Sequence, residues 1–340
     1  MSAVGLDITD QRVRFLELEE GAGGYVVKRY GEAAIPPGVI IGGTIKRSLE
    51  FAAILQGLKR KHGFEFVRVS LPEERAYIVH MDIPRVEEAG VHDAIAFQLE
   101  EYVPLKPDQA IFDYAVLGDD GKSEKMRLLV AVMPEEDVSG YTTVLSEVGM
   151  KPVMLEIEGQ AVAHALVEKG DSRLHMIVDI GRMRTGVSVV KDDIVRFTST
   201  VDMGSDMLTQ SIVQTMNVSE EEAFRLKNEH TLGEHADELG KSIESFLKRL
   251  SGEVEKMYEY WHTYHSDKPS EGPIEEIILS GGGANLPGLT QYLSSELRIP
   301  VSLGNPWRNV NSYDRYIPTI SAKEALGYAT VIGLALPHEE

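Results

Sequence analysis

The chain has 340 residues, 43 % of them hydrophobic and 26 % charged, which is typical of a folded globular protein long enough for two domains. The formal net charge of −20 argues against a nucleic-acid partner or an anionic membrane surface, because both are bound through clustered Lys and Arg. Cys is absent, which excludes disulfides, thiol catalysis and thiolate metal ligands.

The first residues predict a β-meander that starts with a buried strand. "AVGLD" ends in Asp7, and "RVRFLELEE" and "YVVKRYG" follow it on either side of a "GAGG" turn. Asp7 also interrupts the apolar start of the chain, so we expect no signal peptide. Since no run of about 18 apolar residues follows, we expect no direct membrane insertion either. The next segment, "SLEFAAILQGLKRKHG", predicts a helix that ends at Gly63.

Residues 75–150 predict a small α/β subdomain inserted into the first half of the chain. Its strands are "AYIVHMDIP", "AIFDYAVLG" and "KMRLLVAVMP". Its helices are Val91–Val103 and the segment "YTTVLSEVG".

A second meander of the same plan starts at His175. The strand "HMIVDIG" carries Asp179 near its end, as "AVGLD" carries Asp7. The strands "TGVSVV" and "IVRFTSTVDMG" follow it, on either side of a turn at residues 191–193. This internal repeat predicts two similar α/β lobes that face each other. Further along, Ser219 with Glu222 predicts a capping box at the start of a helix.

The stretch "EEIILSGGGANLPGL" combines an apolar strand with the glycine triplet of residues 281–283 and a following helix. Glycines allow a ligand to approach the backbone, and helix-terminal N–H groups favour anions. A tight turn alone would need one or two glycines, so the triplet favours a ligand site. Asp7 and Asp179 could flank a polyphosphate through Mg²⁺ and its waters. Near Asp179, Gly181 and Thr185 could offer a phosphate a backbone turn and a hydroxyl.

These segments resemble the motifs of the actin-like ATPase superfamily. "GLD" at 5–7 and "DIGRMRT" at 179–185 resemble its two phosphate motifs, and "LSGGGANLPGL" at 279–289 its adenosine motif. The inserted segment "MDIPRVEEAGVHDAIAFQLEEYVPLKPDQAIFDYAVLG" resembles the insertion of the PilM-type family of type IV pilus assembly, which is related to FtsA. The similarity extends over nearly the whole chain.

The resemblance implies an α/β fold of two facing actin-like (ribonuclease H-like) lobes with an inserted α/β subdomain as in FtsA and PilM. The first lobe would comprise residues 1–74 and 151–174, and the insertion residues 75–150. The second lobe would comprise residues 175–204 and 270–340, with a helical subdomain at 205–269.

The resemblance also implies a site for ATP and Mg²⁺ between the lobes, with Asp7 and Asp179 as metal ligands. The residues that match its motifs, and are therefore candidates for cofactor binding, are Gly5, Asp7, Thr9, Asp179, Gly181, Thr185, Lys227, Gly281, Gly282, Gly283 and Asn285.

Two departures from the family pattern predict weaker ATP binding. Thr9 occupies the usual glycine position of the first phosphate loop, and Asp10 beside it adds a negative charge. Phe224 occupies the position of the Glu that precedes the ribose-binding Lys, here Lys227, by three residues. We therefore expect a nucleotide-binding scaffold and at most a slow ATPase.

The partner implied by the resemblance is the N-terminal cytoplasmic peptide of a PilN-like inner-membrane protein. The protein would then be cytoplasmic and peripheral to the inner membrane, with the pilus assembly ATPase and a second copy of the chain as further candidate partners. The peptide groove would be walled by Leu71, Pro72, Tyr102, Val103, Pro104 and Leu105.

Two other function classes remain open. A sugar- or acid-kinase-like phosphotransferase on the same fold would need a catalytic base, for which Glu156, Glu158 and Gln160 are the candidates. An FtsA-like filament-forming protein would carry a basic amphipathic helix as membrane tether, which the acidic "ALPHEE" disfavours. The aromatic segment 304–316, "GNPWRNVNSYDRY", predicts a loop that crosses back over its own domain, or a partner surface.

Overall fold

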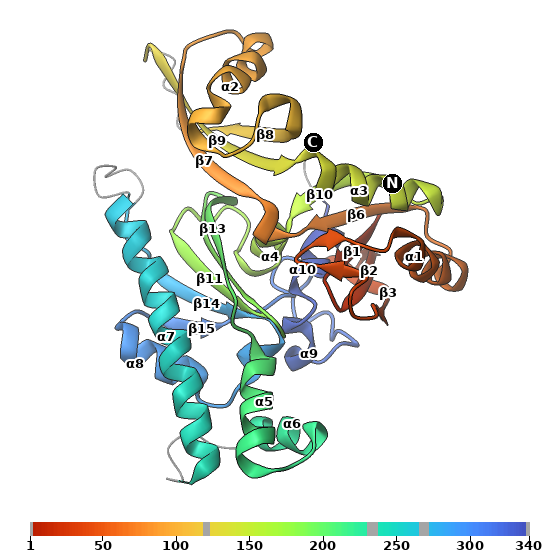
Figure 1. Cartoon of the computed structure of the whole chain (residues 1–340), viewed down its shortest axis with the longest axis vertical. Coiled ribbons are helices and arrows are strands. Elements are labelled where there is room, and N and C mark those ends of the chain that lie inside the picture. The colour runs from red at the N-terminus through yellow and green to blue at the C-terminus, as the bar shows by residue number, and fades with distance from the viewer. Residues whose placement is uncertain (1–2, 118–122, 230–236, 265–271, 338–340) are drawn as a thin grey trace. The chain divides into compact units, whose positions relative to one another are not determined.

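The computed structural model describes residues 3–117, 123–229, 237–264 and 272–337 (Figure 1). The chain separates into unit 1, Met1–Glu17 with Tyr30–Glu158, and unit 2, Leu18–Arg29 with Gly159–Glu340. Residues 159–174, expected in the first lobe, thus cluster with unit 2.

A five-stranded mixed sheet with the order β10-β6-β1-β2-β3 forms the centre of unit 1. Central strand β1 pairs antiparallel with β2 and parallel with β6. Helices α1 and α3 share a core with this sheet, to which Phe51 and Tyr141 contribute fully buried rings. As predicted, α1 ends at Gly63, which adopts φ 69°. The bounds are β1 Val4–Ile8, β2 Arg12–Gly21, β3 Gly24–Ala34, β4 Ile40–Ile41, β5 Thr44–Ile45, α1 Ser48–His62, β6 Phe66–Leu71, α3 Glu135–Glu147 and β10 Lys151–Ile157.

The inserted subdomain of unit 1 is a three-stranded antiparallel sheet with the order β7-β9-β8. Helix α2 covers one face of it and buries Val91, Ile95 and Leu99 against the strands. This helix starts three residues earlier than the periodicity predicted. The bounds are η1 Glu73–Arg75, β7 Tyr77–Pro84, α2 Glu88–Tyr102, η2 Pro107–Gln109, β8 Ala110–Val116 and β9 Lys125–Pro134.

The sheet of unit 2 repeats the topology of the unit 1 sheet. Its order is β13-β12-β11-β14-β15, with β11 antiparallel to β12 and parallel to β14. Strands β1 and β11 therefore hold the same central position, which confirms the repeat that the two acid-tipped strands predicted. The bounds are β11 His175–Ile180, β12 Thr185–Lys191, β13 Ile194–Val201, β14 Glu276–Ser280 and β15 Val301–Leu303.

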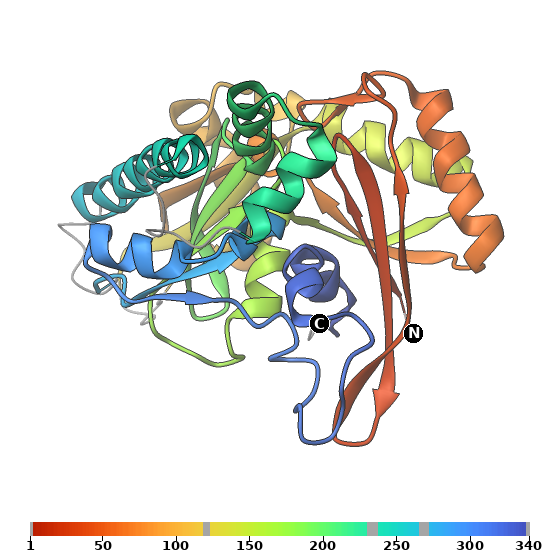
Figure 2. The same cartoon turned by 90° about the horizontal axis from the view of Figure 1, so that it is seen from below.

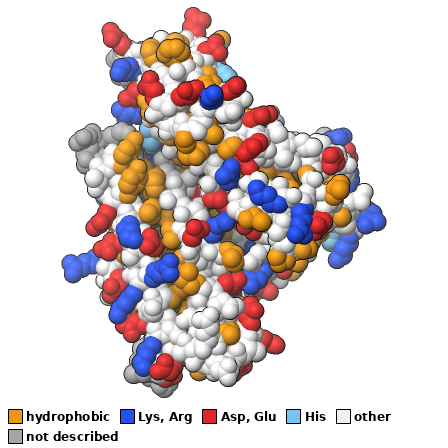
Figure 3. Space-filling model, viewed as in Figure 1, with side chains coloured by type: hydrophobic (Ala, Val, Ile, Leu, Met, Phe, Trp, Pro, Cys, Tyr) orange, Lys and Arg blue, Asp and Glu red, His pale blue; other side chains and the backbone are white. Residues whose placement is uncertain are grey.

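Helices pack on the sheet of unit 2, and the longest, α7, lies beside α5 (Figure 1). Among the described residues, no helix is both long and apolar enough to cross a bilayer. On the face shown in Figure 3, acidic and basic side chains are interspersed. The bounds are α4 Glu158–Leu166, α5 Ser205–Met216, α6 Glu220–Glu229, α7 Glu238–Tyr264, η3 Gly282–Asn285, α8 Leu289–Leu297, α9 Ala322–Leu326 and α10 Ala329–Ala335.

The aromatic segment 304–316 lies along the tip of the β2–β3 hairpin, which belongs to unit 2 (Figure 2). The amide of Tyr25 donates to the carbonyl of Val310 over 2.7 Å. Nδ2 of Asn311 donates to the carbonyls of Ala22 and Tyr25, at 3.4 and 3.2 Å. Trp307 is only 2 % exposed. The segment therefore crosses its own unit, as the first of the two predictions for it stated.

Candidate functional site

In unit 1, the candidate residues lie on β1 and in the turn that follows it. Gly5 is a buried strand residue, paired with Leu16 on β2. Asp7 is 3 % exposed, and its Oδ1 accepts a hydrogen bond from Oγ of Ser70 over 3.0 Å. Burial raises the pKa of Asp7, while Arg14 and the bond from Ser70 act in the opposite direction.

Thr9 closes the turn between β1 and β2. Its amide donates to the carbonyl of Arg12 over 2.9 Å. Its Oγ1 accepts from the amides of Gln11 and Arg12, at 3.4 and 3.2 Å. The side chain that replaces the expected glycine is therefore bonded to its own loop.

The next residue, Asp10, is bonded to a second turn. Its carboxylate oxygens accept from the amides of Gly42 and Gly43, each over 2.9 Å. These glycines connect β4 and β5 with φ of 58° and 72°, a conformation that other residues rarely adopt. The charge of Asp10 thus has a role inside unit 1 that the sequence did not predict.

In unit 2, Asp179 is the penultimate residue of β11 and pairs with Ser280 of the parallel strand β14. The loop after it bonds with its own unit, since Gly181 donates its amide to Arg184 and accepts from the amide of Ser205. Thr185 is 1 % exposed, and its hydroxyl donates to the carbonyl of Met203 over 2.6 Å. A contact from this hydroxyl to a phosphate stays a prediction, and it would require breaking that bond.

The three glycines after β14 have different surroundings. A Cβ at Gly281, where φ is 78°, would lie 2.4 Å from the carbonyl oxygen of Ile180, and one at Gly283 2.4 Å from Cγ2 of the same residue. A Cβ at Gly282 would meet nothing within 4 Å. Packing within unit 2 therefore explains two of the three glycines. Only Gly282 leaves room for a ligand, so the triplet indicates one less strongly than the sequence suggested.

The remaining cofactor candidates are also bonded within unit 2. Nδ2 of Asn285 donates to the carbonyl of Lys323 over 2.9 Å. Lys227 on α6 is 6 % exposed, and its Nζ donates to Oγ1 of Thr209 over 2.9 Å. Burial lowers the pKa of Lys227. Its Nζ also lies 5.0 Å from the ring centroid of Phe224, a cation–π distance.

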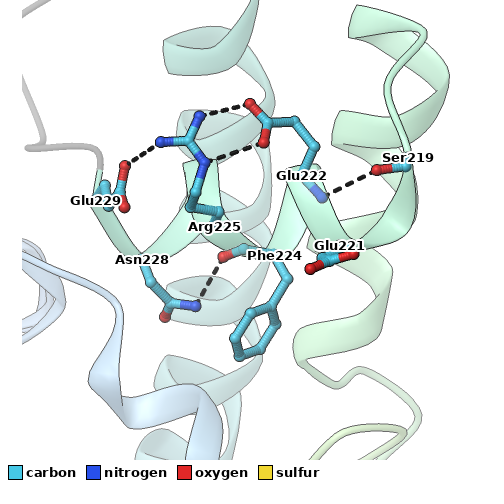
Figure 4. Close-up of a pocket in the computed structure, with 7 residues that line it drawn as sticks. All are labelled: Ser219, Glu221, Glu222, Phe224, Arg225, Asn228 and Glu229. Carbon is cyan, nitrogen blue, oxygen red and sulfur yellow. Dashed lines mark hydrogen bonds and ion pairs between the residues drawn. The ribbon is translucent and has the colours of Figure 1, made fainter.

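An open cavity of about 520 Å³ lies along α6 (Figure 4). Arg225 is held there between the carboxylates of Glu222 and Glu229, at 2.6 and 2.7 Å. The ring of Phe224 points away from these ion pairs and is 59 % exposed. Ser219 caps the helix by accepting from the amide of Glu222, but the Glu222 carboxylate binds Arg225, so only half of the predicted capping box forms.

The three candidate catalytic residues lie at the junction of β10 and α4. Burial raises the pKa of Glu156 to about 8, despite the opposing charge of Arg68. Glu158 is the half-buried first residue of α4. Gln160 holds the β12–β13 turn, since its Nε2 donates to the carbonyl of Asp193 over 2.7 Å and its Oε1 accepts from the amide of Val195 over 2.9 Å.

The candidate partner-binding residues all belong to unit 1 but to two different cores. Leu71 packs in the core of the five-stranded sheet, and Val103 in the core of the insertion. Tyr102 is 39 % exposed, and Pro104 is also exposed. The remaining two candidate partner-binding residues are Pro72, which is buried, and Leu105, which is half-buried.

Sequence reasoning missed the two serines beside the acids, Ser70 and Ser280. The signal was present, because Ser70 is the penultimate residue of β6 and Ser280 the last residue of β14. Each of these strands pairs in parallel with a strand that carries one of the two acids near its end. No cluster of three or more His, Asp or Glu in the described part of the chain could hold a metal. Mg²⁺ commonly binds through one or two carboxylates together with waters and substrate phosphates, so a role of Asp7 or Asp179 as a metal ligand stays a prediction.

The solved structures that resemble this chain have the actin-like fold. The structure described as a PilM-PilN type IV pilus biogenesis complex matches with a TM-score of 0.80 at 20 % identity, over 98 % of each chain. MreB5 of Spiroplasma citri bound to ADP matches with a TM-score of 0.56 at 11 % identity, over 97 % of this chain and 94 % of that one. The ethanolamine utilization protein EutJ of Carboxydothermus hydrogenoformans matches with a TM-score of 0.52 at 14 % identity, over 98 % of this chain and 89 % of that one.

These matches confirm the predicted fold class. The comparison with protein families is more specific, because the family described as Type IV pilus assembly protein PilM matches residues 5–339. That match includes the acid-tipped strands, the insertion and the glycine loop. The chain therefore belongs to the PilM family of type IV pilus assembly proteins.

Proposed function

We propose that this protein is a nucleotide-binding scaffold of type IV pilus assembly that docks the cytoplasmic peptide of a PilN-like inner-membrane protein. The observation that carries the proposal is the family match over residues 5–339. The likeness to a PilM chain solved with PilN supports the choice of partner. Such a scaffold works in the cytoplasm and is held at the inner membrane by its partner.

The docking surface we propose lies around Tyr102 and Pro104, the exposed members of the predicted groove. An extended peptide can bind through main-chain hydrogen bonds while its apolar side chains contact exposed rings of this kind. Leu71 and Val103 would support the surface from the cores in which they are buried.

A fluorescent peptide with the N-terminal sequence of the PilN-like protein encoded nearest to this chain tests the proposal. Tyr102→Ala should weaken its binding about tenfold, since truncating an aromatic contact residue commonly costs over 1 kcal/mol. Phe97 is the matched control, because it is an aromatic residue on the same helix and is 89 % exposed. Equal weakening by Phe97→Ala, or no binding by the wild type, would refute this surface.

For the cofactor, we propose that ATP binds with Mg²⁺, and that Asp7 and Asp179, each considered within its own unit, are the candidate metal ligands. Gly282 supports adenosine binding in unit 2, because it is the one glycine of the triplet with open space at its Cβ position. Bound Mg²⁺ would neutralise phosphate charge. Isothermal titration with MgATP should show binding that Gly282→Asp abolishes, and no heat at millimolar ligand would show that the site is vestigial.

A phosphotransferase is not favoured by the candidate bases. Glu156 with a raised pKa of about 8 is mostly protonated at neutral pH, which reduces the fraction of the protein in which it can accept a proton. Both polar ends of the Gln160 side chain are bonded to the β12–β13 turn. We therefore propose that any ATP hydrolysis is slow, and that nucleotide binding rather than turnover is the relevant property.

A further inference from the structure

The turn after β1 satisfies its main-chain donors with its own atoms. The amides of Gln11 and Arg12 both donate to Oγ1 of Thr9, at 3.4 and 3.2 Å, and that hydroxyl donates to the carbonyl of Arg12 over 3.2 Å. The amide of Thr9 donates to the same carbonyl over 2.9 Å. Three amides of this turn, those of Thr9, Gln11 and Arg12, are thus bonded locally.

Two neighbouring N–H groups that converge on one oxygen atom form the kind of arrangement that binds an anion. In this turn the oxygen is the hydroxyl of Thr9, which can accept two hydrogen bonds. We propose that Thr9 Oγ1 takes the place of a phosphate oxygen. It holds the phosphate loop of unit 1 in a closed state, in which the amides of the loop are hydrogen-bonded to the loop's own oxygen atoms. This inference rests on the proposed nucleotide site and explains why that site would bind phosphate weakly.

The neighbouring residues stabilise the closed turn. The carboxylate of Asp10 is anchored to the amides of Gly42 and Gly43. The guanidinium of Arg12 donates to Glu32 over 3.1 Å. A phosphate that entered this loop would have to displace the hydroxyl of Thr9 while these flanking contacts stay in place. The closed turn therefore lowers the binding free energy that a phosphate group gains in this loop. It leaves the contacts to the nucleoside part of the ligand unchanged.

Binding of MgATP and of adenosine to the full chain separates these two parts of the ligand. Thr9→Ala removes the competing acceptor, and we expect it to strengthen MgATP binding about tenfold, which is roughly one charge-assisted hydrogen bond. Thr9→Ser keeps the hydroxyl and should bind MgATP like the wild type. Adenosine should bind all three proteins equally. Ser312→Ala is the matched control, because Oγ of Ser312 accepts from the amide of Asp314 in an exposed turn of unit 2. Thermal unfolding of each variant checks that the fold is retained.

Three outcomes would overturn the inference in distinguishable ways. If Thr9→Ser strengthens MgATP binding as much as Thr9→Ala, the bulk of the methyl group limits affinity and not the hydroxyl. If Thr9→Ala binds MgATP like the wild type, the loop does not compete with phosphate, although the nucleotide site itself stands. If none of the proteins binds either ligand, the proposed nucleotide site fails and the inference fails with it.

Discussion

The hydroxyl of Ser70 donates to Oδ1 of Asp7 over 3.0 Å, at the end of two parallel strands in unit 1. The repeat in unit 2 places Ser280 beside Asp179 in the same strand arrangement. Ser280 is fully buried, and its Oγ has no hydrogen-bond partner among the described residues. The two halves of the fold thus keep the acid–serine pair, but only the pair in unit 1 satisfies its serine through a hydrogen bond.

Asp7→Asn should raise the melting temperature at neutral pH and abolish Mg²⁺-dependent nucleotide binding. Burial raises the pKa of Asp7 above the unfolded value of 3.8, so the folded state holds the proton more tightly. Stability then falls as the pH rises above 3.8 through the folded pKa, and a neutral Asn removes this loss. Thermal unfolding between pH 4 and pH 8 measures it. A lower melting temperature for Asp7→Asn at pH 7 would contradict the prediction.

Glu156→Gln should flatten the dependence of stability on pH. The pKa of Glu156 is raised from 4.5 to about 8, so wild-type stability should decrease between these values as the unfolded state releases the proton first. The total effect is on the order of a few kcal/mol, since each pKa unit corresponds to about 1.4 kcal/mol. Urea unfolding at pH 5 and pH 8 measures the difference. Equal pH dependence in wild type and variant would show that Glu156 does not cause it.

Alanine substitutions in the glycine triplet should separate packing from ligand access. Gly281→Ala should destabilise unit 2 by about 1–3 kcal/mol, because it combines a positive φ with a clash against the carbonyl of Ile180. Gly282→Ala should change stability by less than about 0.5 kcal/mol, because open space surrounds its Cβ position. Chemical unfolding of both variants decides this, and similar losses would disprove the distinction.

Asn311→Ala should loosen the tip of the β2–β3 hairpin. The variant loses the hydrogen bonds to the carbonyls of Ala22 and Tyr25, at a cost of about 1–2 kcal/mol. Hydrogen exchange of the amides at residues 22–27 should become faster. Asn228→Ala is the control, because its Nδ2 also donates to a carbonyl, that of Phe224, elsewhere in unit 2. Unchanged exchange at the tip in Asn311→Ala would refute the role of this side chain.

Phe224→Glu should strengthen nucleotide binding. The new carboxylate lies one helical turn before Lys227, where it can accept from ribose hydroxyls and favours the charged form of that lysine. When Phe224→Glu is combined with Thr9→Gly, which opens the phosphate turn, we expect a larger gain in MgATP affinity than from either change alone. Titration with MgATP measures the dissociation constants, with Phe224→Gln as the uncharged control. A double variant that binds no better than wild type would show that these departures do not limit affinity.

The sequence alone was sufficient to predict the repeat, the insertion and the family. Strand length, alternation and turn residues are local properties, so the strands that end in Asp7 and Asp179 could be located from their own neighbours. Their equivalent positions in two sheets of the same order follow from that shared local plan. The end of α1 at Gly63 could likewise be predicted, since a left-handed residue there satisfies the last turn of the helix.

The chemical state of the candidate residues was decided by the tertiary structure. The buried bond from Thr185 to Met203 and that from Lys227 to Thr209 join residues 18 positions apart. No sequence pattern specifies such partners, because they depend on which groups the packed elements bring together. The same holds for Gly281, which must be glycine because the carbonyl of Ile180, 101 residues earlier in the chain, lies against it. Sequence therefore identified the candidate residues, whereas packing decided which of their polar groups are bonded within the protein.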